Sequence, residues 1–99
     1  MNVDRAMESS PSTHQPPGIH QLVVPDIGAG PLPLAVSLWL VREGAEVTEG
    51  DRVVELVCGG ATIDLESPVS GRLVQQLVEE DAAVFPGTVI AEFAAAGPA

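Results

Sequence analysis

The sequence has no lysine. Its basic residues are the four arginines Arg5, Arg42, Arg52 and Arg72, against fourteen acidic residues, and the formal net charge is −10 at pH 7. Nucleic acids and anionic membranes attract positively charged surfaces, so this composition argues against both as partners. An acidic chain suits a solvated surface or a protein partner that carries a basic patch.

Cysteine and long apolar runs are also scarce. Cys58 is the only cysteine, so an internal disulfide is impossible and a reducing compartment is suitable. No apolar run is long enough to span a membrane, and the N-terminal segment lacks the basic start and apolar core of a signal peptide. We therefore expect a cytoplasmic protein.

Residues that carry chemistry are few. His14 and His20 have no second histidine or cysteine at metal-binding spacing, so no metal site is expected. Cys58 has no basic neighbour in the sequence that would activate its thiol, and we expect it to be inert. Trp39 lies inside an apolar run and is expected in the core. No nucleophile is paired with a base, so we expect no catalytic activity.

Turn signals divide the chain into short apolar runs. Residues 1–19 are rich in serine, proline and glycine and are expected to form a disordered tail, and residues 94–99 are expected to fray. The domain proper is expected at residues 20–93. Its apolar runs occupy residues 21–24, 34–41, 52–57, 61–65, 71–78 and 89–93. Runs of this length and spacing indicate an all-β domain.

The two halves of this domain repeat each other. When the chain is shifted by 37 positions, residues 40–56 align with residues 77–93, and seven of the seventeen positions are identical. Each half consists of a strand, an acidic turn, a valine, a glycine turn and a second strand. Because one half cannot bury its apolar face alone, we expect the halves to pack about a pseudo-two-fold axis.

Gly59 and Gly60 lie where the halves meet. They separate two strand-like runs, 53–57 and 61–65, and glycine adopts the positive φ of a tight hairpin turn without steric cost. We predict an exposed hairpin at one end of the domain, with Gly59 and Gly60 at its tip and Cys58 beside them.

Five motifs occur in the order and spacing of a known family. They are Val-Pro-Asp-Ile-Gly at 24–28, Trp-Leu-Val-Arg-Glu-Gly at 39–44, the valine, glycine and leucine pattern of 47–56, Glu-Ser-Pro-Val-Ser-Gly at 66–71 and Val-Phe-Pro-Gly-Thr-Val-Ile-Ala at 84–91. The sequence resembles the biotinyl/lipoyl carrier domain superfamily, in particular the lipoyl domain of two-oxo-acid dehydrogenase acyltransferases. The resemblance covers about residues 22–93 and implies a flattened β-barrel, or barrel-sandwich hybrid.

The resemblance also implies a position for a cofactor. In this family a lysine at the hairpin tip carries the lipoyl or biotinyl group as an amide. Counted back from Ser67 and Pro68, that position falls on Gly60, flanked by Gly59 and Ala61. Glycine has no amine, and the chain has no lysine that could replace it. The resemblance therefore implies a degenerate carrier domain without a cofactor.

Acidic residues in the equivalent turns of the two halves are candidates for docking a partner. They are Glu43, Glu46, Glu49, Asp51, Glu79, Glu80 and Asp81. We expect a protein-interaction module, with a component of a two-oxo-acid dehydrogenase assembly as the candidate partner. Two alternatives stay open: a genuine acyl or carboxyl carrier modified in an unforeseen way, and a structural domain like those of membrane-fusion adaptors, whose tip usually extends into a long helical hairpin.

Overall fold

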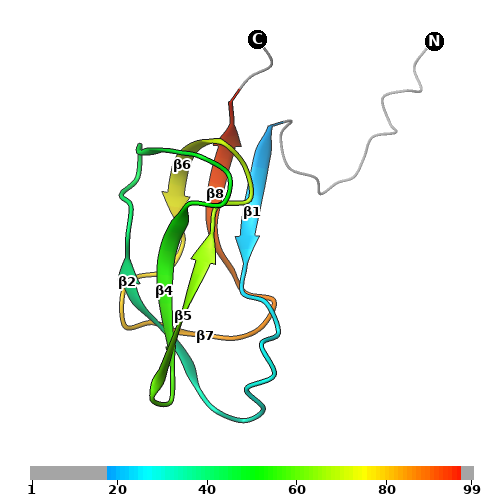
Figure 1. Ribbon diagram of the computed structural model, residues 1–99, viewed down its shortest axis with the longest axis vertical. Helices are drawn as coiled ribbons and strands as arrows, with labels where there is room; N and C mark the ends of the chain where they lie inside the picture. Colours follow the sequence, from blue (N-terminus) through cyan, green and yellow to red (C-terminus); the bar gives the residue numbers. More distant parts are fainter. Residues whose placement is uncertain (1–17, 97–99) are drawn as a thin grey trace, which may run out of the picture.

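The computed structural model describes residues 18–96, which form strands and no helix (Figure 1). The predicted tail, with His14, lies largely outside the described residues, as do residues 97–99. The strands are β1 (Ile19–Val23), β2 (Leu34–Trp39), β3 (Glu46–Val47), β4 (Arg52–Cys58), β5 (Ala61–Glu66), β6 (Gly71–Gln76), β7 (Ala83–Val84) and β8 (Val89–Ala95). None of the described residues belongs to a helix that could span a membrane.

The strands form two antiparallel sheets of four. One has the order β1-β8-β6-β3 and the other the order β5-β4-β2-β7. The chain changes sheet at every connection except the one between β4 and β5, so the two sheets make a flattened barrel-sandwich that is not closed by hydrogen bonds on every side. The predicted all-β fold is confirmed.

The core lies between the two sheets. Alternate side chains of a strand point to the same face, and the inward-facing positions of the long strands are apolar. Phe93, Leu56, Leu73 and Ile90 are the largest fully buried side chains. Trp39 is half-buried at the edge of this core, where its indole N–H donates a hydrogen bond to the carbonyl oxygen of Val78 at 3.1 Å.

The internal repeat is a structural repeat. Shifted by 37 positions, the bounds of β2, β3 and β4 coincide with those of β6, β7 and β8. Two hydrogen bonds of the connecting turns are related by the same shift. The amide of Gly44 donates to the carbonyl of Leu73 at 2.7 Å, and the amide of Asp81 donates to the carbonyl of Val36 at 2.7 Å. The predicted pairing of two similar halves is therefore confirmed down to individual hydrogen bonds.

Strand pairing extends slightly beyond the predicted domain limits of 20 and 93. β1 begins at Ile19, and β8 continues to Ala95. Ala94 pairs with Ile19 on one side and with Arg72 on the other, and the amide of Ala95 donates to the carbonyl of Gly18 at 2.7 Å. These two alanines, which composition alone assigned to a frayed end, are thus part of the sheet because β8 has a neighbour on each side.

Candidate functional site

The predicted hairpin forms between β4 and β5. Cys58 pairs with Ala61, so Gly59 and Gly60 make a two-residue turn. This turn lies at the opposite end of the molecule from the start of β1 and the end of β8 (Figure 1). We call Gly59 and Gly60 the hairpin tip.

The two glycines of the tip differ in backbone conformation. Gly59 adopts a φ of +60°, in the left-handed region that favours glycine, whereas the φ of Gly60 lies outside that region. A Cβ added at Gly60 would meet no atom within 4 Å, and one added at Gly59 would lie 4.0 Å from Cδ1 of Leu32. The backbone at Gly60 therefore has room for a Cβ, although glycine has none.

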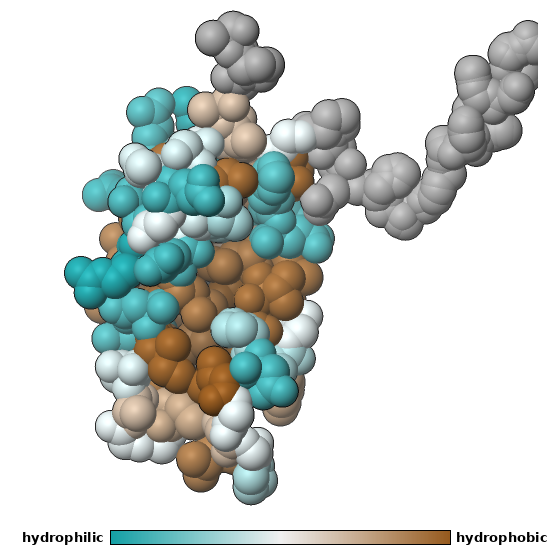
Figure 2. Space-filling view, turned by 45° about the vertical axis from the view of Figure 1, so that its right-hand side comes forward, coloured by the Kyte–Doolittle hydropathy of each residue, from teal (hydrophilic) through white to brown (hydrophobic). Residues whose placement is uncertain are grey.

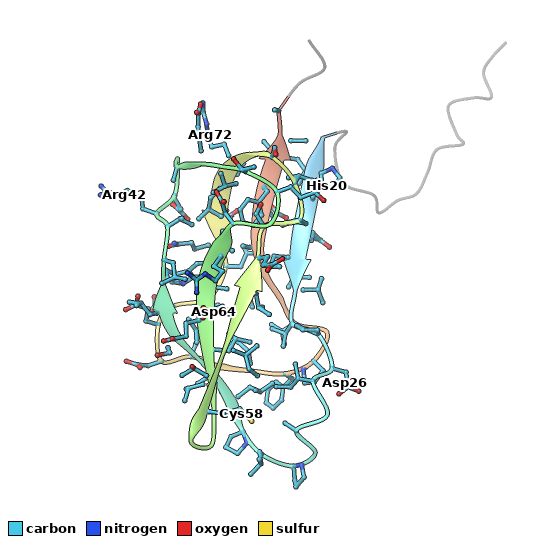
Figure 3. The ribbon with its side chains drawn as sticks, viewed as in Figure 1. His20, Asp26, Arg42, Cys58, Asp64 and Arg72 are labelled. Carbon is cyan, nitrogen blue, oxygen red and sulfur yellow. The ribbon has the colours of Figure 1, made fainter. Side chains whose placement is uncertain are left out.

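The side chains beside the tip offer no substitute for an amine. Ala61 is exposed, and Cys58 is only 8% exposed because it faces the core (Figure 3). Within residues 18–96, no group of three or more His, Cys, Asp or Glu side chains is placed to hold a metal ion.

Two of the predicted docking acids have a structural role instead. Glu43 Oε2 accepts a hydrogen bond from the amide of Gln76 at 2.8 Å, and Glu80 Oε2 accepts one from the amide of Trp39 at 3.0 Å. The two contacts are related by the 37-residue shift. Each carboxylate ties its turn to a strand far away in the sequence, so these residues are less suited to docking than the sequence suggested.

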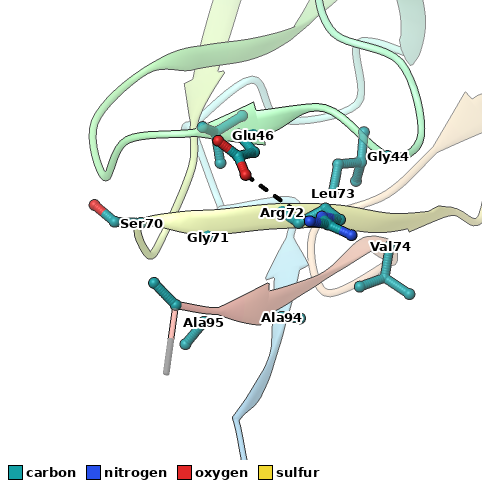
Figure 4. A pocket seen from close by; sticks show the side chains of 11 residues that line it. Gly44, Glu46, Ser70, Gly71, Arg72, Leu73, Val74, Ala94 and Ala95 are labelled. Atoms are coloured by element: carbon teal, nitrogen blue, oxygen red, sulfur yellow. Dashed lines mark ion pairs between the residues drawn. The ribbon is translucent and has the colours of Figure 1, made fainter. Parts of the chain in front are cut away.

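The remaining acids do not form one surface. Glu46 lies 3.8 Å from Arg72, across β3 and β6, beside a hollow that Val74 also lines (Figure 4). Glu79 instead lines a second hollow, together with Trp39 and Arg42. Glu49 and Asp81 are exposed in their turns. Asp51 Oδ2 accepts a hydrogen bond from the amide of Thr48 at 2.9 Å, within its own turn. Glu46 and Glu79 thus line two separate hollows, each of which also contains an arginine, and Glu49, Asp51 and Asp81 lie outside both.

Sequence reasoning missed an apolar hollow near the hairpin tip. It has a volume of about 320 Å³ and is formed by the β1–β2 loop and the β7–β8 loop. Leu32 and Phe85 line it and are 54% and 68% exposed. In Figure 2 the lower half of the molecule, which contains this end, is mostly white to brown, while hydrophilic side chains crowd the upper half. Apolar residues within proline-rich and glycine-rich loops were the signal that could have revealed it.

Comparisons with known proteins agree with this fold. The model of the biotin/lipoyl family, described as "Biotin-requiring enzyme", matches residues 20–93. The chain is 32% identical over 73 residues to the dihydrolipoyllysine-residue acetyltransferase component of the acetoin cleaving system of Pseudomonas putida, covering 74% of this chain and 20% of that protein. It is 34% identical over 74 residues to the corresponding component of the pyruvate dehydrogenase complex of Bacillus subtilis, covering 75% of this chain and 17% of that protein.

A solved structure shares the fold as well. A single-chain, multi-domain long-chain acyl-CoA carboxylase superimposes with a TM-score of 0.70 and 24% identity, over 89% of this chain and 8% of that one. The chain thus spans a fifth or less of the length of these proteins. Since the family model matches nearly all of the described strands, this chain belongs to the biotin/lipoyl domain family and resembles the lipoyl domains of two-oxo-acid dehydrogenase acyltransferases.

Proposed function

We propose that this chain is a lipoyl-type domain that works without a covalently attached cofactor, as a non-catalytic protein-interaction module. The observation that carries the proposal is the glycine at position 60, at the tip of the hairpin, in a chain that has no lysine. The family attaches its lipoyl or biotinyl group through the ε-amine of a lysine at this tip. Without that amine, the amide bond between the protein and the cofactor cannot form.

The rest of the domain supports a role that depends on the fold alone. The hairpin is well formed, its tip is exposed, and the backbone at Gly60 has space for a Cβ. The hairpin thus keeps the shape of a carrier and lacks only the attachment group. Such a domain can still bind another protein through its surface.

We take the partner to be a component of a two-oxo-acid dehydrogenase assembly. Two of the relatives are named as components of the pyruvate dehydrogenase complex and of the acetoin cleaving system. The exposed acids Glu49, Glu79 and Asp81 would face a basic patch on such a partner.

We place the protein in the cytoplasm, since its single cysteine suits a reducing compartment.

Intact mass tests the missing cofactor. The chain purified from its native host should have the mass of its unmodified sequence. The variant Gly59→Asp/Gly60→Lys, expressed in the same host, is the matched control, because it offers a lysine at the same tip. A native chain that carries the added mass of a lipoyl or biotinyl group would refute the proposal.

Affinity capture at low salt tests the interaction, because salt screens contacts between exposed charges. A two-oxo-acid dehydrogenase component should be enriched with the native chain and lost with Glu49→Arg/Glu79→Arg, which reverses two exposed charges. Val23→Ser, which removes an exposed apolar side chain of β1, should leave capture unchanged. Failure to enrich any such component would contradict the proposed partner.

A further inference from the structure

β5 forms an edge of its sheet that none of the described strands covers. β4 is its one neighbour in the sheet, and no other strand within residues 18–96 has Cα atoms within 8 Å of those of β5. An edge strand presents a row of unpaired N–H and C=O groups, which another extended chain can bind. β5 contains no proline, and the extra residue of this strand pair, Val53, lies on β4. The edge is therefore regular over the whole length of β5.

The two faces of β5 differ in character. Alternate side chains of a strand point to opposite faces, so Thr62, Asp64 and Glu66 share one face. Thr62 and Glu66 are exposed. On the other face Leu65 is buried, and Ile63 is half-buried against the core. A strand laid along this edge would place every second side chain beside apolar residues and the others beside acids.

The outward face of β4 and β5 is acidic. These two strands carry Glu55, Asp64 and Glu66, with Arg52 as their one basic residue. Asp64 lies midway along the hairpin, directly opposite Glu55, and like charges in that position repel each other (Figure 3). Asp64 Oδ2 lies 3.3 Å from Nη1 of Arg52, but the side chain of Glu55 makes no hydrogen bond or ion pair within the described residues.

The other half of the sequence repeat provides a comparison. The 37-residue shift maps Glu55 onto Glu92, and Glu92 of β8 is opposite Gln21 of β1 as Glu55 is opposite Asp64. In that strand pair the glutamate therefore faces a neutral amide. Two opposed acids occur in only one of the two equivalent strand pairs, so the fold itself does not require the second acid.

We infer that the free edge of β5 binds an extended segment of a partner protein in which lysine or arginine alternates with apolar residues. The backbone of this segment adds a strand to the sheet. Its apolar side chains lie beside Ile63 and Leu65, and its basic side chains lie beside Asp64 and Glu66.

Charge selects this occupant. The acids of β5 oppose pairing with any acidic strand, including β5 of a second copy, and favour a basic one, which also relieves the repulsion between Glu55 and Asp64. This binding site rests on the proposed role as an interaction module, but it does not include the acids proposed above for docking a dehydrogenase component. The two surfaces can therefore be tested apart.

Peptide binding to the full chain, followed by amide NMR spectra, tests this inference. The probe is a synthetic peptide as long as β5, capped at both ends, in which lysine alternates with valine. At about 0.15 M salt, where exposed charges are screened beyond about 8 Å, shifts should concentrate in residues 61–66. A peptide of the same composition, with its lysines and valines in two separate blocks, is the matched control and should bind at least about tenfold more weakly.

Single-charge variants separate local recognition from general attraction between charges. Asp64→Asn should weaken binding of the alternating peptide by about fivefold to tenfold, whereas Glu92→Gln, in the equivalent strand pair of the other sheet, should leave it within about twofold. Glu55→Gln removes no printed contact of the fold and should give a smaller loss in the same direction, which covers the case that Asp64→Asn disturbs folding.

Four results would overturn the inference. They are no binding of the alternating peptide, equal binding of the two peptides, shifts spread over the acidic turns, and an equal loss in Asp64→Asn and Glu92→Gln. None of these measurements needs a dehydrogenase component, so failure of the proposed partner is seen separately, in the capture experiment.

Discussion

Gly71 gives the most direct test of how closely the strands of the family fold approach each other. It begins β6, where it pairs with Val47 of β3 and with Ala95 of β8. A Cβ built at this position would overlap the carbonyl oxygen of Ala94 and would lie 2.9 Å from the carbonyl carbon of Ala94 and from Cα of Ala95. These are backbone atoms, so no side chain can rotate away to make room.

Gly71→Ala should therefore destabilise the domain strongly. Overpacking a well-packed interior costs about 1–3 kcal/mol when side chains can adjust, and we expect about 3 kcal/mol or more here because β8 itself must move. For a domain of this size each kcal/mol lowers Tm by about 4–8 °C, so the variant should melt at least about 12 °C below the native chain. Thermal unfolding followed by circular dichroism measures the difference.

Gly60→Ala is the matched control for this prediction. It adds the same methyl group to a second strand-flanking glycine, where no atom lies within 4 Å and φ is outside the left-handed region. Because alanine restricts the unfolded chain more than glycine does, this variant should be stabilised by about 0.4–1 kcal/mol. If Gly71→Ala melted within a few degrees of Gly60→Ala, the proposed close approach of β6 and β8 would be wrong.

Three further predictions concern the turns, the core and the tip. Glu43→Ala should lose about 1 kcal/mol of stability because the amide of Gln76 loses its partner, whereas Glu49→Ala, with no comparable contact, should change stability by less than about 0.5 kcal/mol in urea unfolding. Leu56→Ala should cost about 2–5 kcal/mol in the same assay, since Leu56 is fully buried. Gly59→Asp/Gly60→Lys should be modified by an active lipoyl ligase, as seen by intact mass, while arginine in place of that lysine should give no modification; an unmodified lysine variant would contradict the assignment of Gly60.

Much of the fold could be predicted because its signals are local or repeated. The Gly59-Gly60 pair between two apolar runs located the hairpin, and the 37-residue repeat predicted that β2 to β4 and β6 to β8 would be equivalent. Both features depend on the identity and spacing of residues that stand close together in the chain.

The roles of the acidic residues could not be predicted in the same way. An acid in a turn has the same local sequence pattern whether its carboxylate faces water or accepts a hydrogen bond from a distant strand. The partners of Glu43 and Glu80 lie 33 and 41 residues away, and only the folded chain brings them together. The apolar hollow near the hairpin tip was missed for the same reason, because its walls come from the β1–β2 loop and the β7–β8 loop, which are far apart in the sequence.

The position of β1 has a consequence for how the protein is made. Among the described strands β1 is the first to be synthesised, and its neighbour in the sheet is β8, the last of them. The β4–β5 hairpin can form while synthesis continues, but Leu22 of β1, which belongs to the buried core, must wait for its neighbouring strand. Completion of the native sheet is therefore a late event that depends on pairing residues far apart in the chain, and such pairing is slow. Until β8 emerges, the apolar face of the unfinished sandwich is open to chaperones and to other nascent chains.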